Sequence, residues 1–209
     1  MRKINKGKEP AEWTAYRKTP DAQFEAKPEL VDSLLKEQGY VCAFCMGRIS
    51  KEPDKHKVAH LVSQKTCNGD GRELAYNNMV LACPGKTEGH SHCDESQQDA
   101  DLTINFFSDN LNEAISYKRD GTICCSNPVW EKEMTAKKDG LNLNLPRLKE
   151  NRKAVMEGIQ NSLMSKKGWT HPQIKKKLDR WQNKDAEGKY QEYYGVAIWY
   201  LEKKLRQTK

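Results

Sequence analysis

The chain of 209 residues is 36% hydrophobic and 31% charged, and its formal net charge is +7. Its eight Tyr, five Trp and four Phe argue against a disordered chain, and no apolar run approaches the roughly 18 residues of a membrane span. The basic first eight residues lack the apolar segment of a secretory signal. We therefore expect a cytoplasmic protein with no membrane partner, whose seven Cys are thiols or metal ligands rather than disulfides.

The positive charge is concentrated near the C-terminal end. Residues 145–209 hold 16 Lys or Arg against 7 Asp or Glu, whereas residues 1–144 hold 20 against 22. A basic region of this kind indicates a surface that faces a polyanion. A solvated, lysine-rich helical face would give the same pattern, so charge alone does not name a partner.

Two helices are predicted ahead of the first cysteine. Residues 1–27 read as an ordered arm with a short helix over residues 11–18, and this arm is a candidate surface for partner docking. Residues 28–38 predict a helix, because a proline stands in the first turn and Gly39 follows the last apolar residue.

The central stretch predicts a strand, a loop, a second strand, another loop and a helix. In chain order these segments cover residues 58–62, 63–72, 79–82, 84–92 and 94–100. They follow a tight Cys42-Ala-Phe-Cys45 knuckle and a charged loop over residues 50–57. The order of elements is that of a ββα unit.

The remainder of the chain reads as mostly helical. Apolar residues at steps of three and four predict an amphipathic helix from Leu148 to Leu163. Further helices are expected over residues 128–137, 171–182 and 189–206, residues 111–117 read as either extended or helical, and residues 119–122 as a turn. The last helix is apolar on more than one face, as in helices that pack against their own domain or a partner.

These elements predict an α+β fold with a small zinc-stapled ββα core embedded in a mostly helical chain. We divide the chain into an N-terminal arm (1–27), a zinc-stapled domain (28–125) and a basic helical region (126–209).

Four cysteines have the spacing of a structural zinc site. Cys42 and Cys45 form one tight knuckle, and Cys83 and Cys93 form a looser pair that a longer loop can bring to the same metal ion. His90 or His92 could replace Cys93 as the fourth ligand. Packing or surface exposure accounts for the three other cysteines, Cys67, Cys124 and Cys125.

A zinc ion held by four protein ligands has no open position, so it stabilises short strands and leaves the chemistry to other groups. The same reasoning disfavours a zinc hydrolase that acts on small molecules. His60 lies between the two cysteine pairs on the first strand. A lone histidine is more often structural than catalytic, and its role depends on its neighbours.

Taken together, these residues resemble the HNH (ββα-metal) endonuclease family, and more narrowly the PtuB-like nuclease subunits of Septu and retron anti-phage systems. The HNH-like pieces are Cys42-x2-Cys45, Val58-Ala-His60, Asn78-Met-Val-Leu-Ala-Cys83 and Cys93-Asp94. The narrower resemblance adds Met1-Arg-Lys-Ile-Asn-Lys6, Tyr76-Asn-Asn-Met79, Leu141-Asn-Leu-Asn144, Leu148 and Asn151-Arg152.

The resemblance implies a role for each matched position. His60 would be the general base, Asn78 would hold the loop and the base in place, and Asp94 would bind a catalytic Mg²⁺ or Mn²⁺. An imidazole titrates near neutral pH and a hard cation prefers oxygen ligands, so these roles suit phosphodiester hydrolysis. The residue before the histidine is usually an acidic metal ligand in this family, and here it is Ala59.

Three explanations of Ala59 remain open. It is an engineered replacement that inactivates the site, or another carboxylate (Glu52, Asp54 or Glu95) takes over, or the chain is a natural non-cleaving member. With Asp94 as its one carboxylate, the site should bind Mg²⁺ weakly.

The resemblance further implies a PtuA-like ATPase partner and, in retron versions, a reverse transcriptase with its RNA-linked DNA. The substrate would be a nucleic acid, either DNA or an RNA such as tRNA, because lysine contacts with phosphates serve both. The alternative is a zinc-ribbon module that binds nucleic acid or a protein without cutting.

Overall fold

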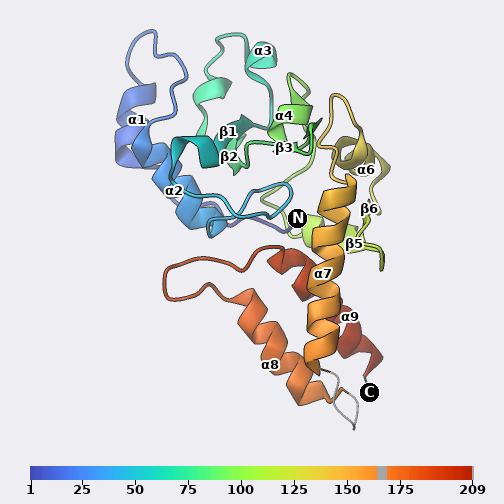
Figure 1. Ribbon diagram of the computed structural model, residues 1–209. Helices are drawn as coiled ribbons and strands as arrows, with labels where there is room; N and C mark the ends of the chain where they lie inside the picture. The colour runs from blue at the N-terminus through green and yellow to red at the C-terminus, as the bar shows by residue number, and fades with distance from the viewer. Residues whose placement is uncertain (164–168, 209) are drawn as a thin grey trace.

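The computed structural model describes residues 1–163 and 169–208. The described chain contains helices and three small two-stranded sheets joined by loops, which confirms the expected mixture of helix and strand. The strands and shorter helices gather at one end, and α7, α8 and α9 extend away from them (Figure 1). Within the described residues, no helix combines the length and the apolar character needed to cross a bilayer.

The N-terminal part contains α1 (Ala11–Arg17) and α2 (Pro28–Gln38). Helix α2 buries its leucine face and ends at Gly39, whose φ of 61° is left-handed and whose Cα faces the ring of Tyr190. The buried side-chain amide of Gln38 donates to the carbonyl of Leu81 and accepts from the amide of the same residue, at 2.8 and 2.7 Å. This exchange holds α2 alongside the second strand of the central sheet.

The arm before α2 belongs to the hydrophobic core of the molecule. Met1, Ile4 and Trp13 are buried in the same cluster as residues of the central and C-terminal parts. The indole of Trp13 donates to the carbonyl of Leu74 at 3.1 Å, across the loop that follows the first strand. Partner docking by the exposed residues of this arm stays a prediction.

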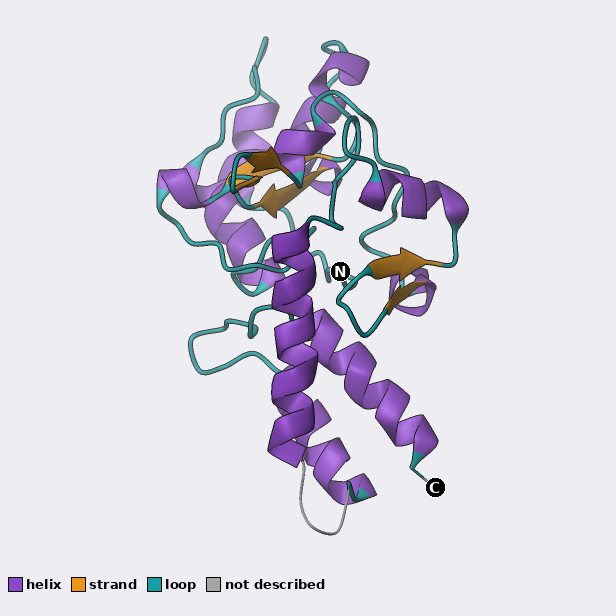
Figure 2. Cartoon of the chain, turned by 45° about the vertical axis from the view of Figure 1, so that its right-hand side comes forward, coloured by secondary structure: helices purple, strands orange, loops and turns teal. Residues whose placement is uncertain are grey.

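The central sheet (Figure 2) pairs β1 (Lys57–His60) with β2 (Met79–Ala82) antiparallel. In this register, Ala59 lies opposite Val80. Strand β2 has the predicted bounds, but β1 stops at residue 60 rather than 62. The side chain of Asn78 bonds the backbone of Val62 on both sides, and this replaces strand pairing there. A 3-10 turn η1 (Pro53–Lys55) lies in the loop before β1.

The connection from β1 to β2 is more ordered than the predicted loop. It contains α3 (Gln64–Cys67), η2 (Arg72–Leu74) and η3 (Tyr76–Asn78). The predicted loop after Cys83 contains a small hairpin of β3 (Lys86–Thr87) and β4 (His90–Ser91). Helix α4 (Asp94–Gln97) is shorter than predicted, because Gln98 has a φ of 54° that ends it.

The ambiguous segment after the central unit is both helical and extended. Helix α5 (Asn110–Ala114) runs directly into β5 (Ile115–Tyr117), which pairs with β6 (Ile123–Cys125) across the predicted turn. Helix α6 (Pro128–Thr135) follows, with Asn127 capping its first amides.

Three helices form the C-terminal end: α7 (Pro146–Leu163), α8 (His171–Gln182) and α9 (Tyr194–Gln207). Helix α9 packs against both α7 and α8. It begins five residues later than predicted, because Tyr193 has a φ of 57° and its amide bonds the carbonyl of Met46 at 3.0 Å. The residues before α9 therefore contact the cysteine knuckle.

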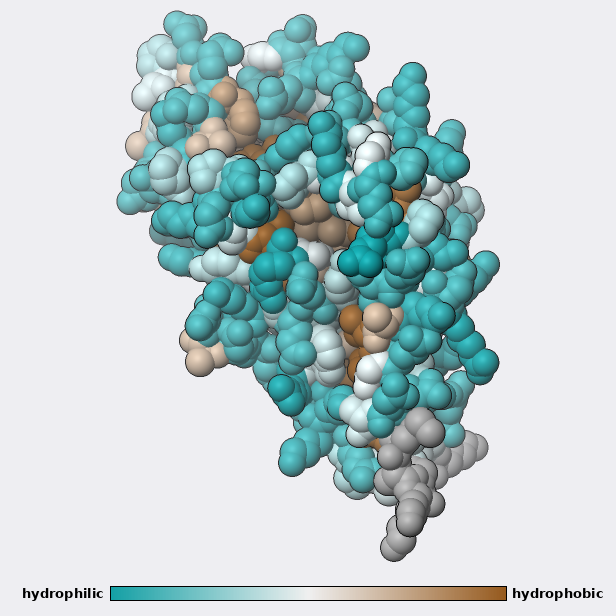
Figure 3. Space-filling model, in the orientation of Figure 1, coloured by the Kyte–Doolittle hydropathy of each residue, from teal (hydrophilic) through white to brown (hydrophobic). Residues whose placement is uncertain are grey.

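The surface of the described chain is largely polar. Hydrophilic side chains cover most of the face in Figure 3, with small apolar areas between them. Among large hydrophobic residues of the described part, Val129 alone is clearly exposed. The core is continuous from the N-terminal residues to α9.

Candidate metal centre

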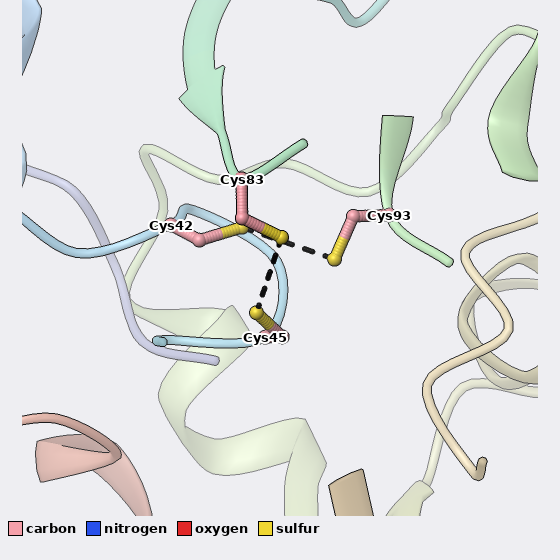
Figure 4. Close-up of side chains that lie close together, drawn as sticks. All are labelled: Cys42, Cys45, Cys83 and Cys93. Atoms are coloured by element: carbon pink, nitrogen blue, oxygen red, sulfur yellow. Dashed lines mark hydrogen bonds between the residues drawn. The ribbon is translucent and has the colours of Figure 1, made fainter. Parts of the chain in front are cut away.

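Four cysteine side chains converge at the base of the central sheet (Figure 4). Cys42 and Cys45 come from the turn after α2, Cys83 follows β2, and Cys93 directly precedes α4. The Sγ atoms of Cys42 and Cys93 are 3.8 Å apart and those of Cys45 and Cys83 are 3.7 Å apart. All four lie within 4.8 Å of one another and all four residues are buried.

This spacing fits a tetrahedral zinc ion. Zinc–thiolate bonds of about 2.3 Å place the four sulfur atoms about 3.8 Å from one another. The four cysteines could therefore hold a zinc ion with little movement. With four protein ligands the ion would have no open position, and its contribution would be to join the knuckle, β2 and α4.

The thiols of Cys42, Cys83 and Cys93 affect one another's ionisation. Burial opposes ionisation of Cys42, but hydrogen bonds from Cys45, Cys83 and Cys93 hold its pKa well below the usual thiol range. Hydrogen bonds with Cys42 and Cys45 raise the pKa of Cys83, and burial with the Cys42 charge raises the pKa of Cys93. The Cys42 thiolate is therefore favoured while the thiols of Cys83 and Cys93 resist ionisation, and a bound cation would favour their thiolate forms.

Backbone hydrogen bonds fix the turn that carries Cys42 and Cys45. Cys42 donates to the carbonyl of Gly47 at 2.9 Å, and Met46 donates to the carbonyl of Cys42 at 3.0 Å. The amide of Gly47 points at the Sγ atom of Cys45 at 3.4 Å. On the other side, Cys93 donates its amide to the carbonyl of Leu141 at 2.8 Å.

The two alternative zinc ligands differ in position. His90 is exposed on the β3–β4 hairpin. His92 is buried beside the cluster, with Nδ1 3.1 Å from the Sγ of Cys93 and Nε2 2.9 Å from the hydroxyl of Thr87. Its pKa is lowered by burial. Among the described residues, the four cysteines form the convergent set, and His92 borders it.

Strand alternation places Ala59 and Lys57 on the same face of β1, with His60 on the other. The ammonium of Lys57 contacts a carboxylate oxygen of Glu95 at 2.5 Å, so this face is turned toward the first turn of α4. Lys86 contacts the other oxygen of Glu95 at 3.3 Å. Ala59 itself is fully buried.

Asp94 is the first residue of α4, directly after Cys93. Burial raises the pKa of its carboxyl to about 6, against the opposing charge of Lys57. A bound cation would offset the cost of ionising this buried carboxyl. Of the other candidate carboxylates, Glu95 adjoins Asp94, whereas Glu52 and Asp54 are exposed and contact Ser50 and Lys55.

The imidazole of His60 is 8% exposed and held on three sides. Nε2 lies 3.0 Å from the carbonyl of Glu73, which assigns the proton to Nε2 and leaves Nδ1 as the basic atom. The side-chain amide of Gln64 donates to Nδ1 at 3.3 Å, and the ring of Phe24 meets the imidazole edge-on at 4.5 Å. Burial lowers the pKa of His60, so the ring is neutral near pH 7.

Asn78 closes the loop that carries these contacts. Its Oδ1 accepts from the amide of Val62 at 2.7 Å, and its Nδ2 donates to the carbonyls of Val62 and Arg72 at 2.9 and 3.1 Å. The two ends of the β1–β2 connection are thereby tied to each other. Within the described chain, no hydrogen bond or ion pair joins the side chains of His60 and Asp94.

Lys57 and Gln97 lie at this site and were not predicted from the sequence. Lys57 stands two residues before Ala59, so strand periodicity could have placed it on the same face. Gln97 stands three residues after Asp94 on one helical turn, and its buried amide donates to the carbonyl of His60 at 2.8 Å.

A second group of ligand-type side chains, Cys67, Asp70 and Glu73, lies within 4.8 Å in the same loop. Asp70 is paired with Arg72 at 2.7 Å, and the thiol of Cys67 contacts the carbonyl of Val62. These contacts are sufficient to explain the group.

No protein-family model matches the chain. A search of curated proteins likewise finds no match.

Proposed function

We propose that the chain is a metal-dependent nuclease of the HNH (ββα-metal) class that hydrolyses phosphodiester bonds in nucleic acid. One arrangement carries the proposal. The four-cysteine cluster joins β2 to α4, and the β1 face that bears residue 59 is turned toward the helix turn that begins with Asp94. A zinc-fastened strand, strand and helix with a buried carboxylate at the helix start is the arrangement that this chemistry needs.

In the proposed reaction, Asp94 would hold a catalytic Mg²⁺ or Mn²⁺, and Ala59 leaves the position of the usual second carboxylate without a ligand. The bound ion would supply charge neutralisation at the scissile phosphate and the leaving oxygen. Lys57 and Lys86, which now contact Glu95, lie where they add positive charge for a phosphate backbone.

His60 acts as the general base through Nδ1. The hydrogen bond from Nε2 to the Glu73 carbonyl fixes this tautomer and stabilises the imidazolium that forms when Nδ1 takes a proton from water. The Gln64 amide and Phe24 lie close to the ring, so substrate binding must displace the amide to bring water to Nδ1. Asn78 positions the loop and does not touch the reacting atoms.

With alanine at position 59, the present chain should bind Mg²⁺ weakly. The experiment therefore restores a carboxylate at this position. Ala59→Glu and Ala59→Asp should gain Mg²⁺-dependent cleavage of plasmid DNA or of tRNA, because a second carboxylate strengthens binding of a hard cation. Ala59→Gln is the matched control, since it has the shape of glutamate without its charge.

Zinc content should be unchanged in all three variants, which shows that the fold is retained. Adding His60→Ala to the Ala59→Glu chain should abolish the gained cleavage. If neither acidic variant cleaves DNA or RNA while both retain zinc, the nuclease proposal is wrong.

A non-cleaving zinc module is the second candidate, and two observations favour it. Residue 59 has no carboxylate, and both nitrogens of His60 are already hydrogen-bonded within the chain. In such a module, nucleic-acid or protein binding would be the same in the parent and in His60→Ala, and no acidic substitution at position 59 would produce cleavage.

The proposed partners are a PtuA-like ATPase and, for a retron-type complex, a reverse transcriptase with its RNA-linked DNA. The exposed faces of residues 1–27 and of α9 are the proposed docking surfaces. Purification of the tagged chain from cells that express the neighbouring genes tests this, with the co-purifying proteins identified by mass and the nucleic acid by nuclease sensitivity.

A further inference from the structure

Arg152 on α7 is a buried cation among neutral partners. Its side chain is among the largest fully buried ones, and the residue is 1% exposed. Its Nε donates to the carbonyl of Gly121 at 2.5 Å, and its Nη2 donates to the carbonyl of Leu143 at 2.7 Å and to Oδ1 of Asn144 at 3.2 Å. Within residues 1–163 and 169–208, no carboxylate lies within ion-pair distance of it.

A buried guanidinium without an anion is costly, because hydrogen bonds to neutral oxygens do not offset its charge. Burial lowers the pKa of Arg152, and the charges of Tyr117, Cys45, Tyr193 and Cys93 oppose that effect. Burial also raises the pKa of both tyrosines well above the usual tyrosine range, so they are neutral at neutral pH. Neither tyrosine therefore supplies the anion that Arg152 lacks.

A four-residue segment links Arg152 to the metal centre through direct hydrogen bonds. We call residues 141–144 the strap. The carbonyl of Leu141 accepts from the amide of Cys93 at 2.8 Å, and the side chain of Asn142 donates to the carbonyl of Ser91 at 2.8 Å. At the other end of the strap, Leu143 and Asn144 accept hydrogen bonds from the guanidinium of Arg152.

The neighbouring residue of α7 reaches the other cysteine pair. The side-chain amide of Asn151 donates to the hydroxyl of Tyr193 at 2.7 Å. The backbone amide of Tyr193 in turn bonds the carbonyl of Met46, the residue after Cys45, at 3.0 Å. Consecutive residues of α7 thus contact segments on both sides of the four-cysteine cluster.

We propose that Arg152 is the counter-cation of the zinc centre and, through the strap, a positioning residue for Cys93. Four thiolates carry four negative charges and Zn²⁺ offsets two of them, so the loaded centre is a buried dianion. One guanidinium in the same low-dielectric surrounding stabilises that dianion, and the dianion stabilises the guanidinium. Helix α7 is then part of the metal site. This inference does not depend on the nuclease proposal.

The test is zinc affinity, measured on the full chain by competition with a chromophoric chelator. Arg152→Met keeps much of the buried shape without the charge, and it should weaken zinc binding by about tenfold to a hundredfold, the usual effect of removing a group that supports metal ligands. Arg152→Lys keeps the charge and loses part of the hydrogen bonding, so its zinc affinity should lie between those of Arg152→Met and the parent.

Two control variants separate charge from packing. Ile159→Ala removes buried apolar contacts from the same helix without changing charge, and Lys153→Met removes an exposed charge next to Arg152. Neither should weaken zinc binding as much as Arg152→Met. Cobalt substitution adds a spectroscopic measurement, in which the thiolate-to-cobalt charge-transfer band should shift in Arg152→Met and stay at the parent position in Ile159→Ala.

The proposal is overturned if Arg152→Met binds zinc as tightly as the parent, or if Ile159→Ala weakens binding to the same extent. It is also overturned if Arg152→Lys is no better than Arg152→Met. Should Arg152→Met fail to fold, the comparison of Arg152→Lys with Ile159→Ala carries the test, because only a charge role predicts that the lysine variant binds zinc more tightly.

Discussion

The side-chain amide of Gln97 donates a 2.8 Å hydrogen bond to the backbone carbonyl of His60. The same nitrogen donates to the carbonyl of Ala100 at 2.9 Å. Through this one side chain, the end of β1 and the end of α4 are held together, and the position of residue 59 relative to Asp94 depends on it.

Replacing Gln97 should loosen that attachment. Gln97→Leu fills similar space but leaves two buried carbonyls without a donor, and we expect a loss of about 1–3 kcal/mol in the free energy of unfolding. Urea denaturation of the zinc-loaded chain measures the loss. Gln98→Leu, at the adjacent exposed position, is the control and should change stability little. Equal midpoints for Gln97→Leu and the parent would show that the bond does not hold the two elements.

Zinc content distinguishes the convergent cysteines from the others. Cys42→Ser and Cys83→Ser should each lose the metal, because either change removes one of four thiolates that meet within 4.8 Å. Cys124→Ser should retain about one zinc per chain, since Cys124 lies on β6 outside the cluster. Elemental analysis after gel filtration measures this. Retention of full zinc by Cys83→Ser would point to His92 as a ligand in its place.

We expect Asn78 to contribute to the stability of the fold rather than directly to the chemical step. Its amide joins Val62 to Arg72 through three hydrogen bonds and is 8% exposed. Asn78→Ala should therefore lower the free energy of unfolding by about 2–3 kcal/mol. The exposed neighbour Asn77 provides the control substitution, Asn77→Ala. A thermal or urea transition that is unchanged in Asn78→Ala would contradict its role as the tie across the loop.

The buried ion pair of Lys6 and Glu37 gives a pH prediction. Burial lowers the pKa of Lys6 from 10.5 to about 8, against the opposing charge of Glu37, and the two charged groups lie 3.4 Å apart. Below pH 8 the lysine is protonated in both states. Between about pH 8 and 10 the unfolded chain binds the proton that the folded chain has released, so stability rises with pH.

Lys6→Met should remove that rise, while Lys8→Met, at an exposed position, should retain it. The relevant quantity is the difference in urea midpoint between pH 7.5 and pH 9.5, because Lys6→Met also removes the cation that faces Glu37 at the lower pH and so changes stability there for a second reason. The same increase in Lys6→Met as in the parent would assign the pH dependence to other groups.

Several elements were predictable because their signals are local. Pro28 and Gly39 bound α2, and the apolar run from Met79 to Ala82 is β2. The four convergent cysteines were predicted from spacing, since a tight knuckle restricts where a zinc ion could sit. Such signals need no knowledge of distant residues.

The rest depends on contacts between residues far apart in the sequence. Phe24 and Glu73 determine the surroundings of His60, and neither is near it in the chain. The start of α9 shifts because Tyr193 bonds Met46 rather than continuing the helix. Arg152 follows Leu148 by four residues and precedes Met156 by four, so it shares the spacing of the apolar residues of α7. That spacing was the sign in the sequence that Arg152 is buried.

The contacts of η2 have a consequence for solvent access at His60. Two consecutive carbonyls of η2 accept hydrogen bonds from different segments. The carbonyl of Glu73 bonds the imidazole of His60, and the carbonyl of Leu74 bonds the indole of Trp13. Phe24 and the Gln64 amide cover two further sides of the ring. Proton exchange between the imidazole and water should therefore depend on the local opening of residues 11–24 as well as on displacement of Gln64, and such an opening costs less than global unfolding. A ligand that clamps this N-terminal segment would slow the exchange without touching a single cysteine.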